Sequence, residues 1–200
     1  MAKLEDAMPY LLDNEGEFAN TAGDAGGETL DGIARREHPE WPGWKILDAL
    51  NLPLHDPCAV YIILKSHAEI EPLVSGFYLR NYWLYDGLLS QPVATKLLDG
   101  AVNMEGNGRA GAAITALQKA IHIQQPQTVL TTGYWPMTEA AANRCDADGL
   151  LEDLARQYVL HYQMILQMHP TDEKFRGNWM HRAAKLPTDF ATDYAKAVSV

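Results

Sequence analysis

Glu15 is the residue whose type and position most directly suggest chemistry. Leu4, Met8, Leu11, Glu15 and Phe18 follow one another at spacings of four, three, four and three residues, so they line one stripe of a predicted helix. An anionic carboxylate in an apolar stripe is costly to bury unless it is paired, hydrated or protonated. The glycine that follows predicts a helix end, where the macrodipole also favours the neutral acid. Burial and dipole together predict a raised pKa for Glu15, which a general acid needs at neutral pH.

The segment after Glu15 supplies two further polar groups. Asp24 lies nine residues beyond Glu15, and Thr29 lies five beyond Asp24, in a stretch interrupted by glycines. We expect this loop to fold back and bring Asp24 and Thr29 opposite Glu15. Two carboxylates facing a cleft, with a hydroxyl to hold water, suit hydrolysis of a glycosidic bond. The spacing alone also fits a hydrated or capping glutamate, and Glu17 and Glu28 are competing carboxylates, so both interpretations stand at this point.

Helical periodicity dominates the rest of the chain and predicts a mainly α fold. The pattern predicts a helix from Asp56–Pro57, a break at Pro72, a helix from about Arg109, a long helix ending near Met168 and a short helix after Pro187. The glycine-rich segment from Phe18 to Ile33 predicts a loop with at most a small hairpin. The stretch from His38 to Trp44 predicts an irregular, exposed loop.

Composition narrows the class of protein. The 200 residues are 47% hydrophobic and 21% charged, which is enough for one substantial domain, or one with a smaller helical annex. The net charge of −10 argues against sequence-independent binding of nucleic acid. No apolar run is long enough to cross a bilayer, and the N-terminus lacks a signal-peptide pattern, so we expect cytoplasmic synthesis without a signal peptide.

The two cysteines, Cys58 and Cys145, have no metal-binding spacing, and the sequence predicts neither a metal nor an organic cofactor. We expect both thiols to be reduced and buried, while a disulfide is the alternative if the protein acts outside the cytoplasm.

Two spaced motifs carry a resemblance to a known family. Residues 14–20 read NEGEFAN and residues 23–33 read GDAGGETLDGI, which resembles the opening motif of glycoside hydrolase family 108. That family contains phage-type and bacterial N-acetylmuramidases, some described as secretion activators. Residues 77–83 resemble the aromatic segment that closes its first half. Residues 98–118 and 175–182 resemble its helical, predicted peptidoglycan-binding C-terminal half, so the resemblance spans residues 8–186.

The resemblance implies a lysozyme-like, mainly helical fold in two halves, residues 1–88 and 89–200, packed as one unit. It implies cleavage of the β-1,4 bond between N-acetylmuramic acid and N-acetylglucosamine, with Glu15 as the catalytic acid. Asp24 and Thr29 fall at the water-handling positions of phage lysozymes, with a gap between them that is one residue shorter here, and they are supporting candidates. The sequence departs from the family pattern at Glu17, which replaces the usual second glycine and adds a negative charge beside the acid.

Several residues are candidates for binding the sugar chain. They are polar or aromatic and lie near the motifs: Glu17, Phe18, Trp41, Trp44, Tyr82 and Asn103. Aromatic side chains stack on sugars, although they also fill protein cores. For Asn103, the alternative role is to hold helix ends together.

We therefore expect a peptidoglycan hydrolase that acts on glycan strands in the periplasm or cell wall, as an endolysin or as a wall-remodelling enzyme for secretion. A holin or export machinery would be the partner that brings it there. The alternative is a non-catalytic peptidoglycan-binding module of an envelope or secretion complex. A lytic transglycosylase, which leaves 1,6-anhydro ends, is a third possibility.

Overall fold

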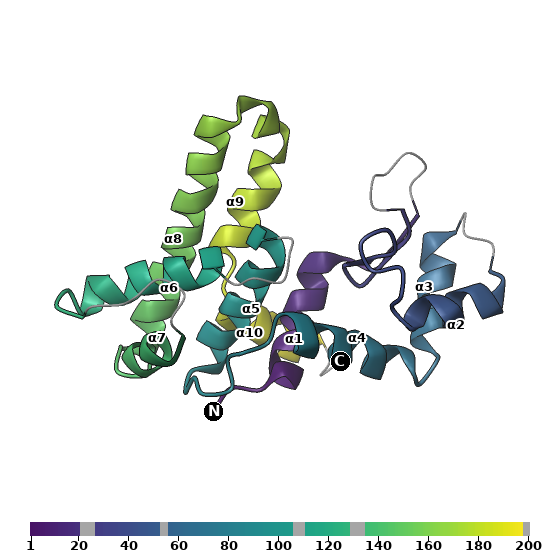
Figure 1. Cartoon of the computed structure of the whole chain (residues 1–200), viewed down its shortest axis with the longest axis horizontal. Helices are drawn as coiled ribbons and strands as arrows, with labels where there is room; N and C mark the ends of the chain where they lie inside the picture. Colours follow the sequence, from purple (N-terminus) through teal and green to yellow (C-terminus); the bar gives the residue numbers. More distant parts are fainter. Residues whose placement is uncertain (21–26, 53–55, 106–110, 129–134, 198–200) are drawn as a thin grey trace. The chain divides into compact units, whose positions relative to one another are not determined.

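The computed structural model describes residues 1–20, 27–52, 56–105, 111–128 and 135–197, and these residues are mainly helical (Figure 1). In chain order the elements are α1 (Leu4–Glu15), β1 (Phe18–Ala19), β2 (Thr29–Leu30), β3 (Ile33–Ala34), α2 (Gly43–Leu50), α3 (Pro57–Lys65), α4 (Ile70–Asn81), α5 (Gln91–Glu105), α6 (Gly111–Gln124), α7 (Trp135–Ala142), α8 (Ala147–Met168), the 3-10 helix η1 (Pro170–Phe175), α9 (Arg176–Ala184) and α10 (Pro187–Ala197). The predicted mainly α fold, with a small hairpin after the first helix, is confirmed.

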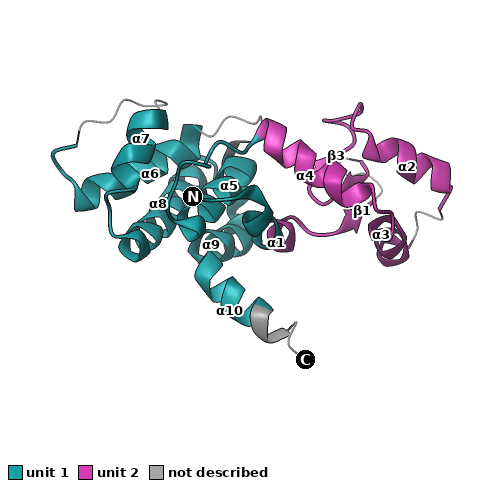
Figure 2. Ribbon diagram, turned by 90° about the horizontal axis from the view of Figure 1, so that it is seen from below, with its two compact units in different colours: residues 1–10, 82–200 teal, residues 11–81 magenta. Residues whose placement is uncertain are grey.

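The chain forms two compact units, which Figure 2 shows in different colours. Unit 2 comprises Leu11–Asn81, and unit 1 comprises Met1–Tyr10 together with Tyr82–Val200. These units differ from the predicted halves, because the first ten residues group with the C-terminal part of the chain. The functional division into a catalytic half and a peptidoglycan-binding half remains a prediction.

A small antiparallel sheet of strand order β1-β2-β3 follows α1 in unit 2. Phe18 pairs with Leu30, and Leu30 in turn pairs with Ile33, so only Asp31 and Gly32 form the turn between β2 and β3. Both turn residues have positive φ, 48° and 81°, as a type I′ hairpin turn requires. The three apolar side chains of the paired residues are buried and anchor the hairpin in the unit 2 core.

The end of α1 differs in part from the prediction. The helix ends at Glu15, and Gly16 follows with a φ of 81°, as expected of a glycine that terminates a helix. The prediction that Phe18 continues the helical stripe is wrong, because Phe18 lies in β1. Its spacing from Glu15 mimics a helical repeat, but the left-handed glycine between them has already ended the helix.

The helices α3 and α4 test two proline predictions. Asp56 caps α3 as predicted, since its carboxylate accepts a hydrogen bond from the Ala59 amide at 3.1 Å, and Pro57 occupies the first turn. The predicted break at Pro72 is wrong. Pro72 lies in the first turn of α4, where a missing N–H costs no helical hydrogen bond. The chain is interrupted earlier, between Lys65 and Ile70.

In unit 1 the long helix α8 confirms the predicted amphipathic pattern. Its buried residues include Leu151, Leu154, Tyr158 and Tyr162, and they face α5, α6 and α9. Figure 1 shows α8 and α9 running side by side. The predicted helices near Arg109 and after Pro187 correspond to α6 and α10, although Arg109 itself lies outside the described residues.

Lys96 of α5 is fully buried in unit 1 and satisfies carbonyls at the end of α9. Its ammonium donates to the carbonyls of Arg182 and Lys185, both at 2.8 Å, and lies 3.7 Å from the Asp99 carboxylate. A cation is favourable at a helix C-terminus, where carbonyls lack intrahelical partners. Burial nevertheless lowers the pKa of Lys96 to about 8, although Asp99 pulls the pKa upward.

The two cysteines differ in exposure. Cys58 is exposed and Cys145 is half-buried, so the prediction that both are buried is wrong for Cys58, which lies in the first turn of α3. Among the helices that the structure describes, none combines the length and apolar character needed to span a membrane.

Candidate active site

Glu15 is half-buried at the last position of α1, and its side chain rests against the turn between β2 and β3. The backbone of Gly32 leaves no room for a side chain here. A methyl group on the Gly32 Cα would lie 2.8 Å from Oε2 and 3.0 Å from Cβ of Glu15. The same methyl group would lie 2.6 Å from the phenol oxygen of Tyr78. Gly32 is therefore required both by its positive φ and by close approach.

Hydrogen bonds from two directions hold the turn that carries Gly32. The Tyr78 hydroxyl, buried on α4, donates to the carbonyl of Asp31 at 2.7 Å. The Asp31 amide donates to the carbonyl of Glu17 at 3.0 Å, which ties the turn to the chain just after Glu15. The turn is thus fixed at its backbone by α4 and by the residue before β1.

The side chain of Asp31 is fully buried and is compensated in part by α3. Its Oδ2 accepts a hydrogen bond from the Lys65 ammonium at 3.3 Å, the Tyr61 hydroxyl favours the charged carboxylate, and Oδ1 has no hydrogen-bond partner among the described residues. Burial raises the pKa of Asp31, the charge of Lys65, the Tyr61 hydroxyl and the hydrogen bond from Lys65 lower the pKa in part, and the nearby charge of Glu17 raises it. Burial is the main reason why the pKa of Tyr61 lies well above its usual range, and the negative charge of Asp31 raises this pKa further.

Of the two supporting catalytic candidates, only Thr29 is described. It is half-buried on β2, where it pairs with Ala19 and Ala34. Thr29 lies three residues before Gly32, on the strand that leads into the turn. Asp24 lies outside the described residues. The roles of both remain predictions.

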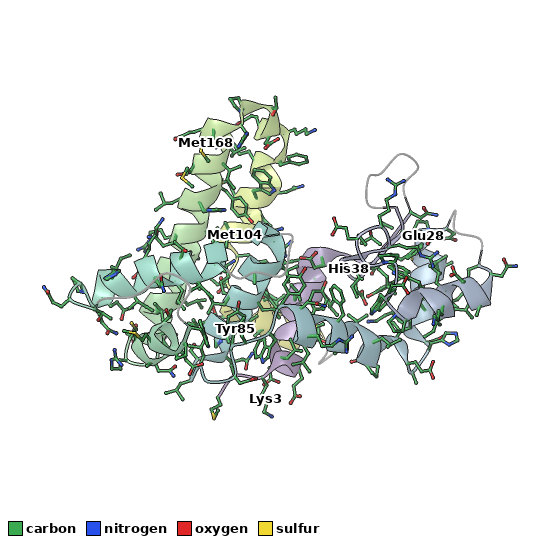
Figure 3. All side chains as sticks on the ribbon, in the orientation of Figure 1. Lys3, Glu28, His38, Tyr85, Met104 and Met168 are labelled. Carbon is green, nitrogen blue, oxygen red and sulfur yellow. The ribbon has the colours of Figure 1, made fainter. Side chains whose placement is uncertain are left out.

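The two competing carboxylates, Glu28 and Glu17, lie in different surroundings from Glu15. Glu28, labelled in Figure 3, pairs with Arg35, with 3.0 Å between Oε2 and Nε, and Arg35 also pairs with Asp48 at 2.7 Å. Glu28 is therefore part of an ion-pair network at the base of the hairpin. Glu17 is exposed, and its charge acts on Asp31 and Tyr61.

The predicted aromatic sugar-binding residues of unit 2 lie largely in the core. Phe18, Trp41 and Trp44 are 6%, 5% and 3% exposed, so these rings fill the core, which is one of the two alternatives that the sequence left open. Each indole N–H finds a carbonyl: Trp41 donates to Leu73 at 3.3 Å and Trp44 to His38 at 2.9 Å. These bonds let the rings pack edge to face, 5.0 Å apart. A role for them in binding sugar remains a prediction.

Trp41 also lines a cavity of about 340 Å³ in unit 2. Phe77 forms part of the same lining, together with the polar residues His38 and Arg80. Aromatic surface beside a few polar groups is common in ligand pockets of this size.

Tyr82 and Asn103 belong to unit 1, whereas Glu15 belongs to unit 2. Tyr82 is 8% exposed. Asn103 on α5 accepts a hydrogen bond from the Tyr162 hydroxyl on α8, which matches the alternative role of holding helices together. Binding of substrate by either residue remains a prediction.

Sequence reasoning missed Asp31, Lys65 and Tyr61 as neighbours of the site. The Asp-Gly pair is a strong signal for a two-residue hairpin turn, and it could have placed Asp31 and Gly32 in the turn. Nothing in the local sequence links that turn to Lys65, which lies 34 residues away.

Comparisons with known proteins give a family match for part of the chain and a similar fold for most of it. The family model described as glycosyl hydrolase 108 matches residues 8–105, a segment that includes Glu15, Asp24 and Thr29. The structure of Brucella abortus SagA is similar, with a TM-score of 0.51 and 22% sequence identity over 90% of this chain and 88% of that one. At this identity the similarity concerns the fold. No curated protein matches the sequence. Residues 8–105 are therefore assigned to the glycosyl hydrolase 108 family.

Proposed function

We propose that this glycoside hydrolase is an N-acetylmuramidase that uses Glu15 as its general acid. It cleaves the β-1,4 bond between N-acetylmuramic acid and N-acetylglucosamine in peptidoglycan. The observation that carries the proposal is the position of the Glu15 carboxylate, half-buried at the end of α1 and packed against a turn that admits only glycine. The family assignment supports a hydrolase of peptidoglycan type.

In this mechanism the Glu15 carboxylic acid donates its proton to the glycosidic oxygen as the bond to the sugar breaks. The sugar left behind develops positive charge, and a water molecule or a carboxylate must then add to it. Asp24 is the candidate for positioning or activating that water, or for attacking the sugar directly. Thr29 is the candidate for holding the water through its hydroxyl. Whether the enzyme inverts or retains the sugar depends on the separation of the two carboxylates.

The site of action follows from the substrate. Peptidoglycan lies outside the inner membrane, so the proposed enzyme acts in the periplasm or cell wall. A holin or an export system is the corresponding partner, whether the enzyme serves as an endolysin or in wall remodelling for secretion. The C-terminal half, residues 89–200, is proposed to bind the glycan strand.

The proposal is tested by digesting purified peptidoglycan and reading the products by mass spectrometry. Wild type should release fragments with reducing muramic-acid ends, and Glu15→Gln should release none, because the amide keeps the shape but cannot donate the proton. Glu71→Gln is the matched control: it removes one exposed carboxylate from α4 of the same unit and should leave the products unchanged.

The other products separate the alternatives. Anhydro ends from wild type would keep the glutamate but change the reaction to a lytic transglycosylase. Binding of the polymer without release of fragments, at several pH values and salt concentrations, would instead identify a non-catalytic peptidoglycan-binding module. Equal activity of wild type and Glu15→Gln would remove Glu15 from the mechanism.

A further inference from the structure

We propose that Asp31, Lys65 and Tyr61 form an anchor that fixes the β2–β3 turn beside Glu15, which makes Asp31 a positioning residue for the general acid. The positioning role rests on the proposed function, whereas the attachment of the turn to α3 does not. The anchor joins a two-residue turn to the C-terminal end of α3 through one buried carboxylate.

The hairpin needs such an attachment because it is too small to hold itself in place. Each of its strands has two residues, and short hairpins are marginal in water unless they pack against other elements. Tyr78 of α4 holds the backbone of the turn through the carbonyl of Asp31. The anchor supplies an attachment from another helix, α3, through the side chain of the same residue.

The turn itself does not require the buried charge of Asp31, so this charge must have a further role. A type I′ turn is satisfied by Asn-Gly, which has no charge to desolvate. A carboxylate with no exposed surface is costly unless a cation and hydrogen bonds compensate it. Here Lys65 supplies both the cation and a hydrogen bond at 3.3 Å, and the Tyr61 hydroxyl of the same helix also favours the charged form. Lys65 can reach the Asp31 carboxylate only when the turn lies in this position against α3. The ion pair therefore specifies where the turn lies.

The position of the turn matters for Glu15 because the two are in direct contact. Gly32 is the neighbour of Asp31 in the turn, and it lies so close to Glu15 that a methyl group on its Cα would be 2.8 Å from Oε2 and 3.0 Å from Cβ of Glu15. If the turn moves away, the Glu15 carboxylate loses the contact with Gly32 that restricts its position. A displacement of about 1 Å at a catalytic group can reduce the rate about a hundredfold.

Lys65→Met tests the anchor while keeping most of the side-chain stem. The Lys65 side chain is 30% exposed, so the variant should fold, and circular dichroism checks this. We expect faster amide hydrogen exchange in residues 28–36. On soluble glycan fragments we expect kcat to fall about tenfold to a hundredfold, with KM changed less than about twofold. Lys65→Arg restores a cation and should recover both exchange and kcat.

The controls make each outcome decisive. Glu71→Gln should match wild type in exchange and in kcat. Wild-type exchange and kcat in Lys65→Met would overturn the proposal, and so would a loss that Lys65→Arg fails to recover. If wild type hydrolyses nothing, the proposed function and the positioning role fail together. The exchange data then decide the attachment alone: slow exchange in Lys65→Met would refute it and fast exchange would support it.

Discussion

Among single residues, Gly32 has little freedom to change, because both its positive φ and its close neighbours exclude a side chain. We expect Gly32→Ala to reduce hydrolysis about a hundredfold, since the new methyl group must displace Glu15 or Tyr78. Unfolding stability should fall by about 1–2 kcal/mol from the left-handed backbone, and further from the crowding. Rates on peptidoglycan fragments and urea unfolding measure the two effects.

Gly16→Ala is the matched control for this substitution. Gly16 has the same φ of 81°, and a methyl group there would meet nothing within 4 Å apart from its chain neighbours Glu15 and Glu17. The two variants therefore share the backbone strain, and only Gly32→Ala adds crowding across the turn against Tyr78 and Glu15. Equal activity of Gly16→Ala and Gly32→Ala would show that backbone strain alone, and not the contact, explains any loss.

Among the elements, α4 contributes to the site through one buried hydroxyl. Tyr78→Phe keeps the ring, which is 1% exposed, and removes the hydrogen bond to the Asp31 carbonyl. A buried carbonyl left without a donor costs about 1–3 kcal/mol, so we expect a loss of stability in that range and faster amide exchange in the hairpin. Urea unfolding and hydrogen exchange by mass spectrometry check this, and unchanged values in both would contradict it.

The elements also show what the sequence can predict. Local signals placed α3, through its Asp56 cap and Pro57, and α8, through its apolar repeat, because each depends on residues within one helix. The same logic failed at Pro72, where a proline starts a helix instead of breaking one. It failed again at Phe18, whose spacing continues a helical repeat across a glycine that ends the helix.

The candidate site was predicted only as far as its local part. Glu15 and its following glycine were identified from the spacing of α1, and the small hairpin from its glycine content. The ion pair between Asp31 and Lys65, and the burial of Trp41 and Trp44, depend on how α2, α3 and α4 pack around the hairpin. Such contacts join residues far apart in the chain, and one sequence contains no local signal for them.

For the protein as a whole, the buried Lys96 predicts how stability depends on pH. Its pKa is about 8 in the folded state against 10.5 when unfolded, because burial disfavours the charged form. The unfolded state therefore binds more protons between these values, and stability rises with pH in that window. From pH 7 to pH 9 the expected gain from Lys96 is about 1 kcal/mol.

Lys96→Met removes this titration together with the hydrogen bonds to the Arg182 and Lys185 carbonyls. The variant should be less stable than wild type at pH 7, and the difference should widen by about 1 kcal/mol at pH 9. Comparing the two proteins cancels groups that titrate in both, such as Cys145, whose pKa burial raises. Urea unfolding, followed by fluorescence and circular dichroism, gives the difference at each pH. A difference that stays constant or narrows would show that Lys96 keeps its proton in the fold, with the Asp99 carboxylate outweighing the effect of burial.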